Sequence, residues 1–354
     1  MPDFTRWLLN ASKAGRPLLP GEFVWSPAKH FLFRKCRRAW FFRHYLAQGG
    51  WNSLSADPAA HAFLLKYLDT ADSWMSSTAE DSLSGALLDT ARIRDESRKD
   101  ELTEAFQVRV SARLLQARED LSREAALDDP KRTSFLELHY DTGEYHSAQE
   151  LLTVIRNRFR DFFRQWESSG LSEELAAVDT LDWRLPPEYR LFHYAGRQIS
   201  LRPWIYAVQR RTVRAWTIHF AYSAPDQIAG FPQDDEEYGL PEKVFAAWCA
   251  ARYPDFEVEV NKIYLTGEDM VRRKEIPAPV SEDLVVCSSC DMLEAVNHPD
   301  GLRSEEFPRL TDRNQCVNCR FRSLCDTEGV PPEEDEGSDP EGGAGTGQLG
   351  ENLP

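Results

Sequence analysis

The chain has 354 residues, of which 42% are hydrophobic, and a formal net charge of −16 at pH 7. This length suits one large domain or two ordinary ones, and ten tryptophans are typical of a folded protein with a sizeable core. No apolar run approaches the roughly 18 residues of a membrane span, and the N-terminus lacks the pattern of a signal peptide. We therefore expect a cytoplasmic protein with no membrane contact. Its seven cysteines are expected to be metal ligands or buried thiols rather than disulfides.

Charge is distributed unevenly along the chain. Residues 326–354 contain nine acids and neither Lys nor Arg, so removing these acids from −16 leaves −7 for residues 1–325. Within residues 1–45, by contrast, Lys and Arg outnumber the acids. Such a basic segment can track phosphates, and the alternative is a solvated helix face. The tail over 327–354 is expected to be disordered because it cannot bury enough apolar surface to offset its ordering entropy.

Hydrophobic periodicity predicts helices in the first half of the chain and strands mainly in the second. The predicted helices span 28–47, most of 57–125, 147–167, 241–253 and 281–296. The predicted strands span 189–194, 199–206, 213–221 and 257–265. A short extension over 1–23 precedes a helical part over 24–187, and a core with a cysteine-rich end follows over 188–326. We expect the last two parts to form one compact α/β unit.

Four cysteines are divided between the two ends of this unit. Cys316, Cys319 and Cys325 form a C-x2-C-x5-C run, and Cys36 lies about 280 positions earlier in a basic, aromatic segment. The run supplies three thiolates in one tight loop. A cubane cluster or a tetrahedral metal needs a fourth ligand, which has to come from elsewhere in the chain.

These features together resemble the iron–sulfur branch of the PD-(D/E)XK nuclease superfamily, which includes RecB-like nuclease domains and the CRISPR-associated Cas4 nucleases. The resemblance covers most of residues 24–326. It is carried by Trp25–Lys29, by the segment around Cys36, by Gly49–Trp51, by Phe307–Pro308 and by the cysteine run. Each piece is weak alone, and their order makes the set fairly specific.

The resemblance implies a PD-(D/E)XK-like α/β core. We expect a sheet of about four to five strands flanked by helices, a large helical insertion and a C-terminal loop that holds a metal cluster. It also implies a [4Fe–4S] cluster, with zinc as the alternative. The implied ligands are Cys36, Cys316, Cys319 and Cys325.

Active relatives hold Mg²⁺ with an acid that follows a Pro on one strand and with an Asp-x-Lys motif on the next. Here Pro203 places Trp204 at the first acidic position, and a slip of two residues would place Tyr206 there. On the next strand, His219 replaces the acid and Ala221 replaces the Lys. Trp and Ala cannot bind Mg²⁺ or move a proton.

Two further motifs of the family have changed as well. Glu80 stands where RecB-like members carry a His, and Val244 and Trp248 stand where a later helix carries Gln and Tyr. We therefore expect no Mg²⁺ site and no ordinary nuclease activity. The alternative is an active nuclease with a rearranged site built from Glu80, His193, Tyr206 and His219, in which His193 and His219 lie on neighbouring strands.

Cys287 and Cys290 form a second C-x2-C pair, which together with Cys316 and Cys319 could build a zinc ribbon. Helical spacing over 283–295 places Cys287 at a core-like position, which favours buried thiols instead. Cys249 lies on an apolar helix and is expected in the core. A zinc-binding scaffold is therefore a second alternative to the iron–sulfur protein.

The function expected from the resemblance is that of a pseudoenzyme: a nuclease-like, DNA-associated or protein-docking subunit. DNA and a helicase or nuclease subunit are the expected partners. Arg34, Arg37 and Arg38 can share one helix face at i, i+3 and i+4, and are the expected phosphate contacts. The alternative is that these arginines pair with acids of a neighbouring helix and only hold helices together.

Overall fold

The structure is a computed structural model that describes residues 22–48, 50, 58–122, 132–140, 144–185, 190–221, 239–266, 269–297, 307–308, 316 and 319–327. Residues 1–21 of the predicted N-terminal extension, Gly49, Trp51 and the acidic tail beyond 327 therefore lie outside the described residues. No helix in the described ranges is long and apolar enough to cross a bilayer.

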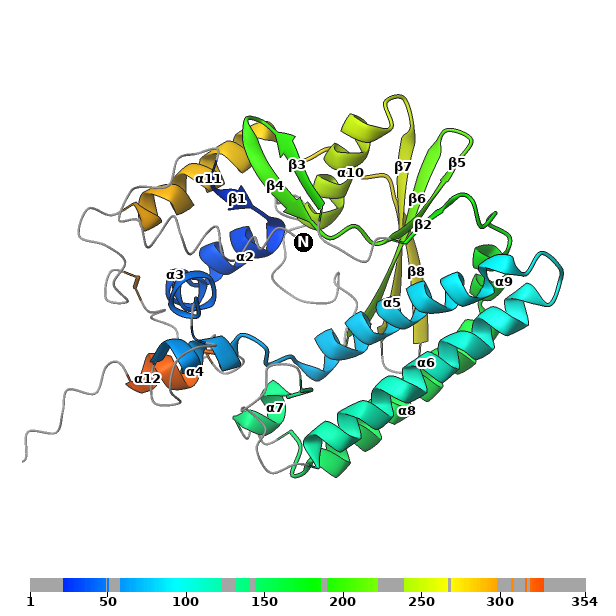
Figure 1. The fold of residues 1–354 in the computed structure, drawn as a ribbon, viewed down its shortest axis with the longest axis horizontal. Helices are drawn as coiled ribbons and strands as arrows, with labels where there is room; N and C mark the ends of the chain where they lie inside the picture. The colour runs from blue at the N-terminus through cyan, green and yellow to red at the C-terminus, as the bar shows by residue number, and fades with distance from the viewer. Residues whose placement is uncertain are drawn as a thin grey trace, which may run out of the picture.

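A mixed five-stranded sheet lies between two groups of helices (Figure 1). Its spatial order is β2-β5-β6-β7-β8. The strands are β2 (Trp183–Arg184), β5 (Ile205–Gln209), β6 (Thr212–Ala221), β7 (Glu257–Thr266) and β8 (Asp269–Glu275). Only β6 and β7 run parallel, and α10 (Leu240–Arg252) lies between them in sequence, as the crossover between two parallel strands requires. The mixed α/β class expected from the sequence is confirmed.

Alternation along β6 sends side chains to two separate hydrophobic clusters. Trp216, Ile218 and Phe220 join one cluster, and Val213 and Ala215 join the other. The first cluster is covered by long helices, which lie along one face of the sheet in Figure 1. These helices are α5 (Ala71–Asp89), α6 (Arg98–Leu121), α8 (Ala148–Ser168) and the short α9 (Leu171–Ala176). The predicted helices over 57–125 and 147–167 are thus present, the former as several segments.

The opposite face of the sheet packs against α10 and against elements from both ends of the chain. A small sheet of order β1-β4-β3 belongs to this side, and β1 pairs in parallel with β4. Its strands are β1 (Val24–Trp25), β3 (Arg190–Tyr194) and β4 (Arg197–Leu201). The helical elements are α2 (Pro27–Lys35), α3 (Arg37–Phe41), the π-helix η1 (Phe42–Leu46), α4 (Pro58–Leu65), α11 (Glu282–Val296) and α12 (Arg322–Thr327). The short α7 (Leu136–His139) belongs with the long helices, because its Leu138 packs against the first cluster. Figure 1 shows α12, from the end of the chain, beside α4, from its beginning.

Two predicted elements differ from the structure, and the two-residue strands β1 and β2 were not predicted. The single strand expected over 199–206 is two strands in different sheets, because the chain leaves β4 at Arg202 and Pro203 lacks the N–H that a ladder needs. The single helix expected over 28–47 is broken at Cys36, whose φ of −158° is extended. Strand β8, at the edge of the sheet, was not predicted.

A buried ion cluster fastens α10 to the sheet. The Lys262 ammonium on β7 lies 2.9 Å from Glu242 Oε1 of α10 and 2.8 Å from Glu275 Oε2 of β8. Burial alone would lower the pKa of Lys262, but the two carboxylates raise it above its ordinary value. The cluster therefore stays charged, and loss of one partner would leave an uncompensated charge inside the protein.

Candidate metal centre and vestigial strand site

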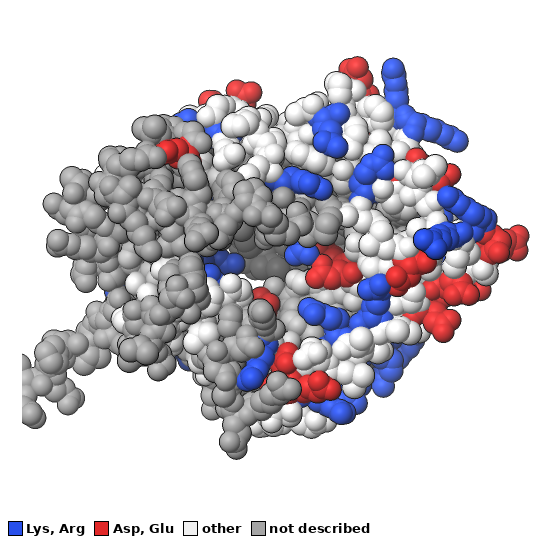
Figure 2. Space-filling model, in the orientation of Figure 1, with Lys and Arg blue, Asp and Glu red and all other residues white. Residues whose placement is uncertain are grey.

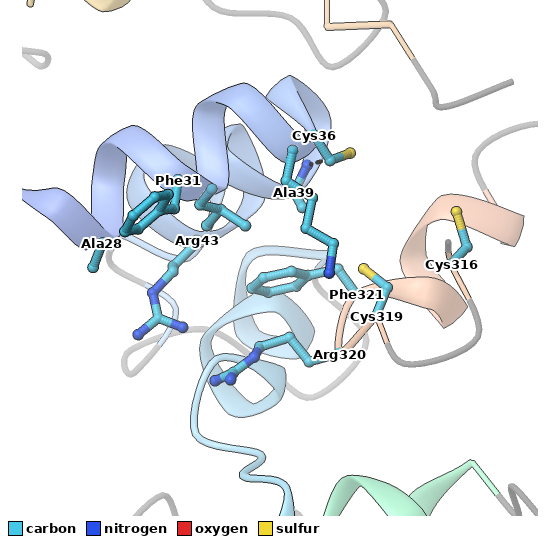
Figure 3. A pocket seen from close by; sticks show the side chains of 11 residues that line it. Ala28, Phe31, Cys36, Ala39, Arg43, Cys316, Cys319, Arg320 and Phe321 are labelled. Carbon is cyan, nitrogen blue, oxygen red and sulfur yellow. Dashed lines mark hydrogen bonds between the residues drawn. The ribbon is translucent and has the colours of Figure 1, made fainter. Parts of the chain in front are cut away.

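The helix break places Cys36 between two helices. Cys36 is at once the last cap of α2 and the first cap of α3, and its Sγ accepts a hydrogen bond from the Ala39 N–H at 3.4 Å. A continuous helix would have kept the residue within a regular turn. The extended backbone instead turns the thiol toward the C-terminal cysteines (Figure 3).

All four predicted ligands line one small cavity: Cys36, Cys316, Cys319 and Cys325. Three of them, without Cys325, also line a larger adjoining cavity, and Figure 3 shows these three grouped at one side of it. Burial raises the pKa of the Cys319 thiol, and the other three cysteines raise it further. The structure thus brings together the four residues that the sequence singled out.

The donor set consists of thiols alone. None of the seven cysteines forms a disulfide, and the four that share the cavity are neither fully buried nor fully exposed. Thiolates are the ligands of iron–sulfur clusters and of zinc sites built from four cysteines, so the residues fit either group. In the described part of the chain, no three His, Cys, Asp or Glu side chains are spaced to hold a single metal ion as they stand.

Aromatic packing holds the two ends of the chain together around the cysteines. The rings of Phe41 and Phe307 stack with centroids 4.7 Å apart, and Phe42 lies 5.9 Å from Phe321. The Tyr140 hydroxyl donates to the Arg320 carbonyl at 2.6 Å. These contacts bring the segments of the chain that carry the thiols together.

Of the arginines expected to contact phosphates, one is in the interior. Arg38 is only 5% exposed; its Nη1 donates to the Phe307 carbonyl at 3.4 Å and its guanidinium lies over Phe42. The prediction that Arg34, Arg37 and Arg38 share one helix face is wrong, because the break at Cys36 separates the first from the other two. Arg34 and Arg37 are exposed.

The strand positions at which the sequence resemblance implied metal ligands are filled by packed side chains. Trp204 precedes β5, with its ring 5.5 Å from Phe245 of α10. Tyr206 is buried within β5, and its hydroxyl lies 3.4 Å from that of Tyr253. Val244 is fully buried on α10, in the same hydrophobic cluster. Core filling accounts for these positions.

His219 is a packed, neutral imidazole. Its Nε2 lies 2.9 Å from Thr217 Oγ1, and its ring stacks on Tyr264 with centroids 5.0 Å apart. Burial, with Lys262 nearby, lowers the pKa of His219 to about 4. Ala221 ends β6, where it pairs with Thr266.

The alternative site that joins His219 to His193 is not assembled. His193 belongs to β3 of the three-stranded sheet, whereas His219 lies on β6 of the five-stranded sheet. The residue that pairs with His193 in the register is Gln198 of β4. The expectation that these histidines lie on neighbouring strands is therefore wrong.

Glu80 hydrogen-bonds to the edge of β6 where no neighbouring strand is described. Strand β5 ends its pairing with β6 at Trp216, and α5 runs along the part of β6 that follows. Glu80 Oε1 accepts from the Ile218 N–H at 3.3 Å, and Ser76 Oγ accepts from the Phe220 N–H at 3.0 Å. Burial raises the pKa of Glu80 to about 7.

The second C-x2-C pair is separate from the first. Cys287 lines a groove together with His30 and Asp283, whereas Cys290 Sγ accepts from Arg197 at 3.4 Å. Both thiols are exposed on α11 and line neither cysteine cavity, so the expectation of buried thiols here is wrong. The structure therefore does not assemble the zinc ribbon considered from the sequence. Cys249 is fully buried, as predicted.

Two groups of polar residues at these sites were not found from the sequence. The buried Glu242–Lys262–Glu275 cluster was missed, although the alternation along β7 places Lys262 on an inward face. Arg43 was seen only as one of the basic side chains around Cys36, and its place beside Arg320 in the larger cysteine cavity was missed because the two come from opposite ends of the chain. No signal in a single sequence pairs two such distant residues.

No family model matches this chain, and no curated protein matches it. Among solved structures that are similar, one titled "Crystal structure of SSO0001" is 13% identical and covers 72% of this chain and 98% of its own. Its TM-score of 0.29 is too low to support an argument about fold or function.

Replacing Glu80 by Gln should stabilise the protein at neutral and alkaline pH. The folded-state pKa of about 7 lies above the ordinary value of 4.5, so the folded protein holds this proton more tightly than the unfolded chain. Ionisation therefore lowers stability progressively as pH rises from about 4.5 to about 7. Gln cannot ionise and keeps the acceptor for the Ile218 N–H. Above pH 7 we expect a gain of about 3 kcal/mol in the free energy of unfolding.

Urea denaturation of both proteins between pH 4 and pH 8.5 measures this difference. The exposed Glu104 on α6 provides the matched control, and Glu104→Gln should change stability little at any pH. If the stability of Glu80→Gln depended on pH in the same way as that of the wild type, the raised pKa of Glu80 would be contradicted.

Proposed function

We propose that this chain is a catalytically inactive, PD-(D/E)XK-like iron–sulfur protein that serves as a nucleic-acid-associated or protein-docking subunit. Cys36, Cys316, Cys319 and Cys325 would hold a [4Fe–4S] cluster. The bound cluster would supply a covalent tie between the two ends of the chain. The observation that carries the proposal is the cavity shared by all four thiols.

The order of the core elements supports the fold assignment. An antiparallel hairpin of β5 and β6 is followed by α10 and then by β7, which lies parallel to β6. The sequence-based alignment places the lost metal ligands at the start of this hairpin and near the end of β6. Trp204 and His219 occupy those places. Neither is an acid.

The side chains around the former site support an inactive protein. The half-buried His219 imidazole, with a pKa of about 4, is neutral at physiological pH, and the buried Lys262 ammonium already forms ion pairs with two nearby carboxylates. Metal-assisted hydrolysis needs carboxylates that are open to a metal ion and to its water. At this face of the sheet, the described carboxylates Glu242 and Glu275 are bound to Lys262 instead.

The nucleic-acid contact that we propose is smaller than the sequence indicated. Arg34, Lys35 and Arg37 are exposed around the helix break, where the cluster would hold the backbone in place. Charged groups on a rigid support meet a phosphate backbone at constant spacing. Elsewhere on the surface, Figure 2 shows acids and bases intermingled over the helical layer, which favours no single polyanion.

Replacing Cys36 by Ser should abolish the cluster and lower stability. Protein purified without oxygen should be brown and contain about four irons per chain. Serine keeps the cap to the Ala39 N–H, so this variant removes the ligand without removing the cap. Visible absorption, iron analysis and thermal unfolding measure the effect. Cys287→Ser, at an exposed thiol outside the cavity, should keep both colour and stability.

A colourless wild-type protein that contains zinc would favour the zinc scaffold over the iron–sulfur protein. A brown Cys36→Ser protein with full iron content would show that Cys36 is not a ligand.

The protein should not cut DNA. With Mg²⁺ or Mn²⁺ and an intact cluster, we expect no cleavage of single- or double-stranded DNA above a protein-free control, because no described residue at the strand positions can replace the lost acids and Lys. Gel assays with end-labelled DNA test this. Reproducible cleavage that disappears in His219→Ala would show a rebuilt active site.

Binding to nucleic acid should be independent of sequence and should weaken with salt. Replacing Arg34 and Arg37 by Gln should reduce the slope of log affinity against log salt by about 0.7–0.9 for each lost phosphate contact. Fluorescence anisotropy with a protein that lacks residues 328–354 removes competition from the acidic tail. Absence of binding at micromolar protein and low salt would favour the protein-docking role instead.

A further inference from the structure

The larger of the two cysteine cavities extends well beyond the thiols. It has a volume of about 370 Å³ and lies between α2, η1 and the residues that precede α12. We refer to it as the Arg43 cavity. Figure 3 shows Cys36, Cys316 and Cys319 at one side of it, and Arg43 and Arg320 at the opposite side. A cluster on the thiols would occupy only the first side.

The lining of the Arg43 cavity is cationic. Lys35, Arg43 and Arg320 line it, and no Asp or Glu appears among its described lining residues. The nearby carboxylate of Asp69 interacts with both guanidinium groups. One acid therefore faces two arginines at the side of the cavity that is remote from the thiols.

More cations lie just behind this wall. Lys29 and Lys66, together with Arg43, lower the pKa of the buried His44 imidazole, which places all three near it. Lys29 Nζ donates to the Val24 carbonyl at 2.6 Å and lies over the Phe23 ring. These described partners carry no negative charge. Like charges gathered in a poorly solvated region repel one another, and an anion in the cavity would relieve this repulsion.

The cluster alone does not account for these cations. Arg38 and Arg322 line the small cavity that contains all four thiols, whereas Arg43 and Arg320 do not. Arg43 and Arg320 lie across the larger cavity from the thiols (Figure 3). Their position suits a second anion better than the cluster.

The remaining lining is apolar and partly aromatic. Phe31, Leu32 and Phe321 contribute to it, with Ala28 and Ala39 as small neighbours. Phe31 lies on the same side as Arg43, and the ring of Phe321 lies between the thiols and the arginines (Figure 3). Aromatic faces stack on nucleobases, and a guanidinium fork matches a phosphate. The volume falls within the range of small-molecule sites.

We propose that the Arg43 cavity binds a nucleoside monophosphate group, either as a free nucleotide or as the phosphorylated end of a nucleic-acid strand. Arg43 and Arg320 would hold the phosphate, and Phe31 and Phe321 would pack against the base. Binding of a strand end rests on the proposed function. Binding of a free nucleotide does not, because it needs no association with nucleic acid.

The test uses full-length protein purified without oxygen, so that any cluster is retained. The probes are thymidine 5′-monophosphate, thymidine, and a short oligothymidylate with either a 5′-phosphate or a 5′-hydroxyl. Calorimetry measures the free nucleotides and fluorescence anisotropy measures the strands. We expect the phosphate to strengthen binding by about tenfold or more in at least one pair of probes.

Variants then locate the binding. Arg43→Gln and Phe31→Ala should each weaken phosphate-dependent binding by about tenfold, and Arg43→Lys, which keeps the charge without the fork, should lie in between. The control is Arg156→Gln, at an exposed arginine on α8, which should bind like the wild type. Visible absorption and thermal unfolding confirm that each variant is folded. Because Phe31→Ala removes no charge, it separates loss of the site from loss of general electrostatic attraction.

Three results would overturn the inference. These are failure of all four probes to bind, equal binding with and without the phosphate, and phosphate-dependent binding that survives in folded Arg43→Gln and Phe31→Ala proteins. Equal binding of the strands with and without the 5′-phosphate would still support nucleic-acid association, but it would show that the Arg43 cavity takes no part in it. Phosphate-dependent binding of the free nucleotide alone would support the cavity and argue against nucleic-acid association.

Discussion

The structure depends on the meeting of the two ends of the chain on one face of the five-stranded sheet. Strand β1 pairs with β4, and Trp25 Nε1 and His30 Nδ1 both contact Ser288 Oγ of α11, at 2.9 and 2.7 Å. The Arg320 guanidinium donates to the Lys66 carbonyl at 2.8 Å. One hydrophobic cluster contains residues from 23 to 68 and from 280 to 324. These contacts join positions more than 250 residues apart, so they form only when the whole domain is folded.

This closure explains why the cysteines can act as a unit without lying on a common element. The two helices beside Cys36 are short, and in the described part of the run from Cys316 to Cys325 the helix α12 begins only at Arg322. Helices this short are marginal without tertiary packing. The aromatic contacts among Phe41, Phe42, Phe307 and Phe321 hold the two segments together, and these contacts need no metal. A cluster bound there would add to a closure that packing already favours.

Much of the scaffold could be predicted from the sequence, because it depends on local periodicity. The inward residues of α8, such as Ile155, Phe159 and Phe162, are buried as their 3.6-residue spacing indicated. Strand β8 was missed because it is an edge strand with alternating exposed, charged residues, a pattern that resembles a loop. The break at Cys36 was missed because it depends on capping at one residue, and no change in composition marks it. Arg38 was misassigned because a charged residue in a basic segment is expected at the surface, whereas here Phe42 and the Phe307 carbonyl accommodate it.

At the strand site, the residues found at the positions singled out from the sequence complete the packing. Beyond Trp216 one edge of β6 has no strand partner in the described sheet. Here α5 covers that edge, and Ser76 and Glu80 accept the backbone N–H groups that β5 leaves unpaired. On the α10 side, Lys262 forms ion pairs with two carboxylates. The His219 ring stacks on Tyr264, and its lowered pKa keeps it neutral. An acid introduced at position 219 would therefore not by itself create a metal site: the new carboxylate would face a buried ammonium that is already shared, beside a strand edge that α5 covers.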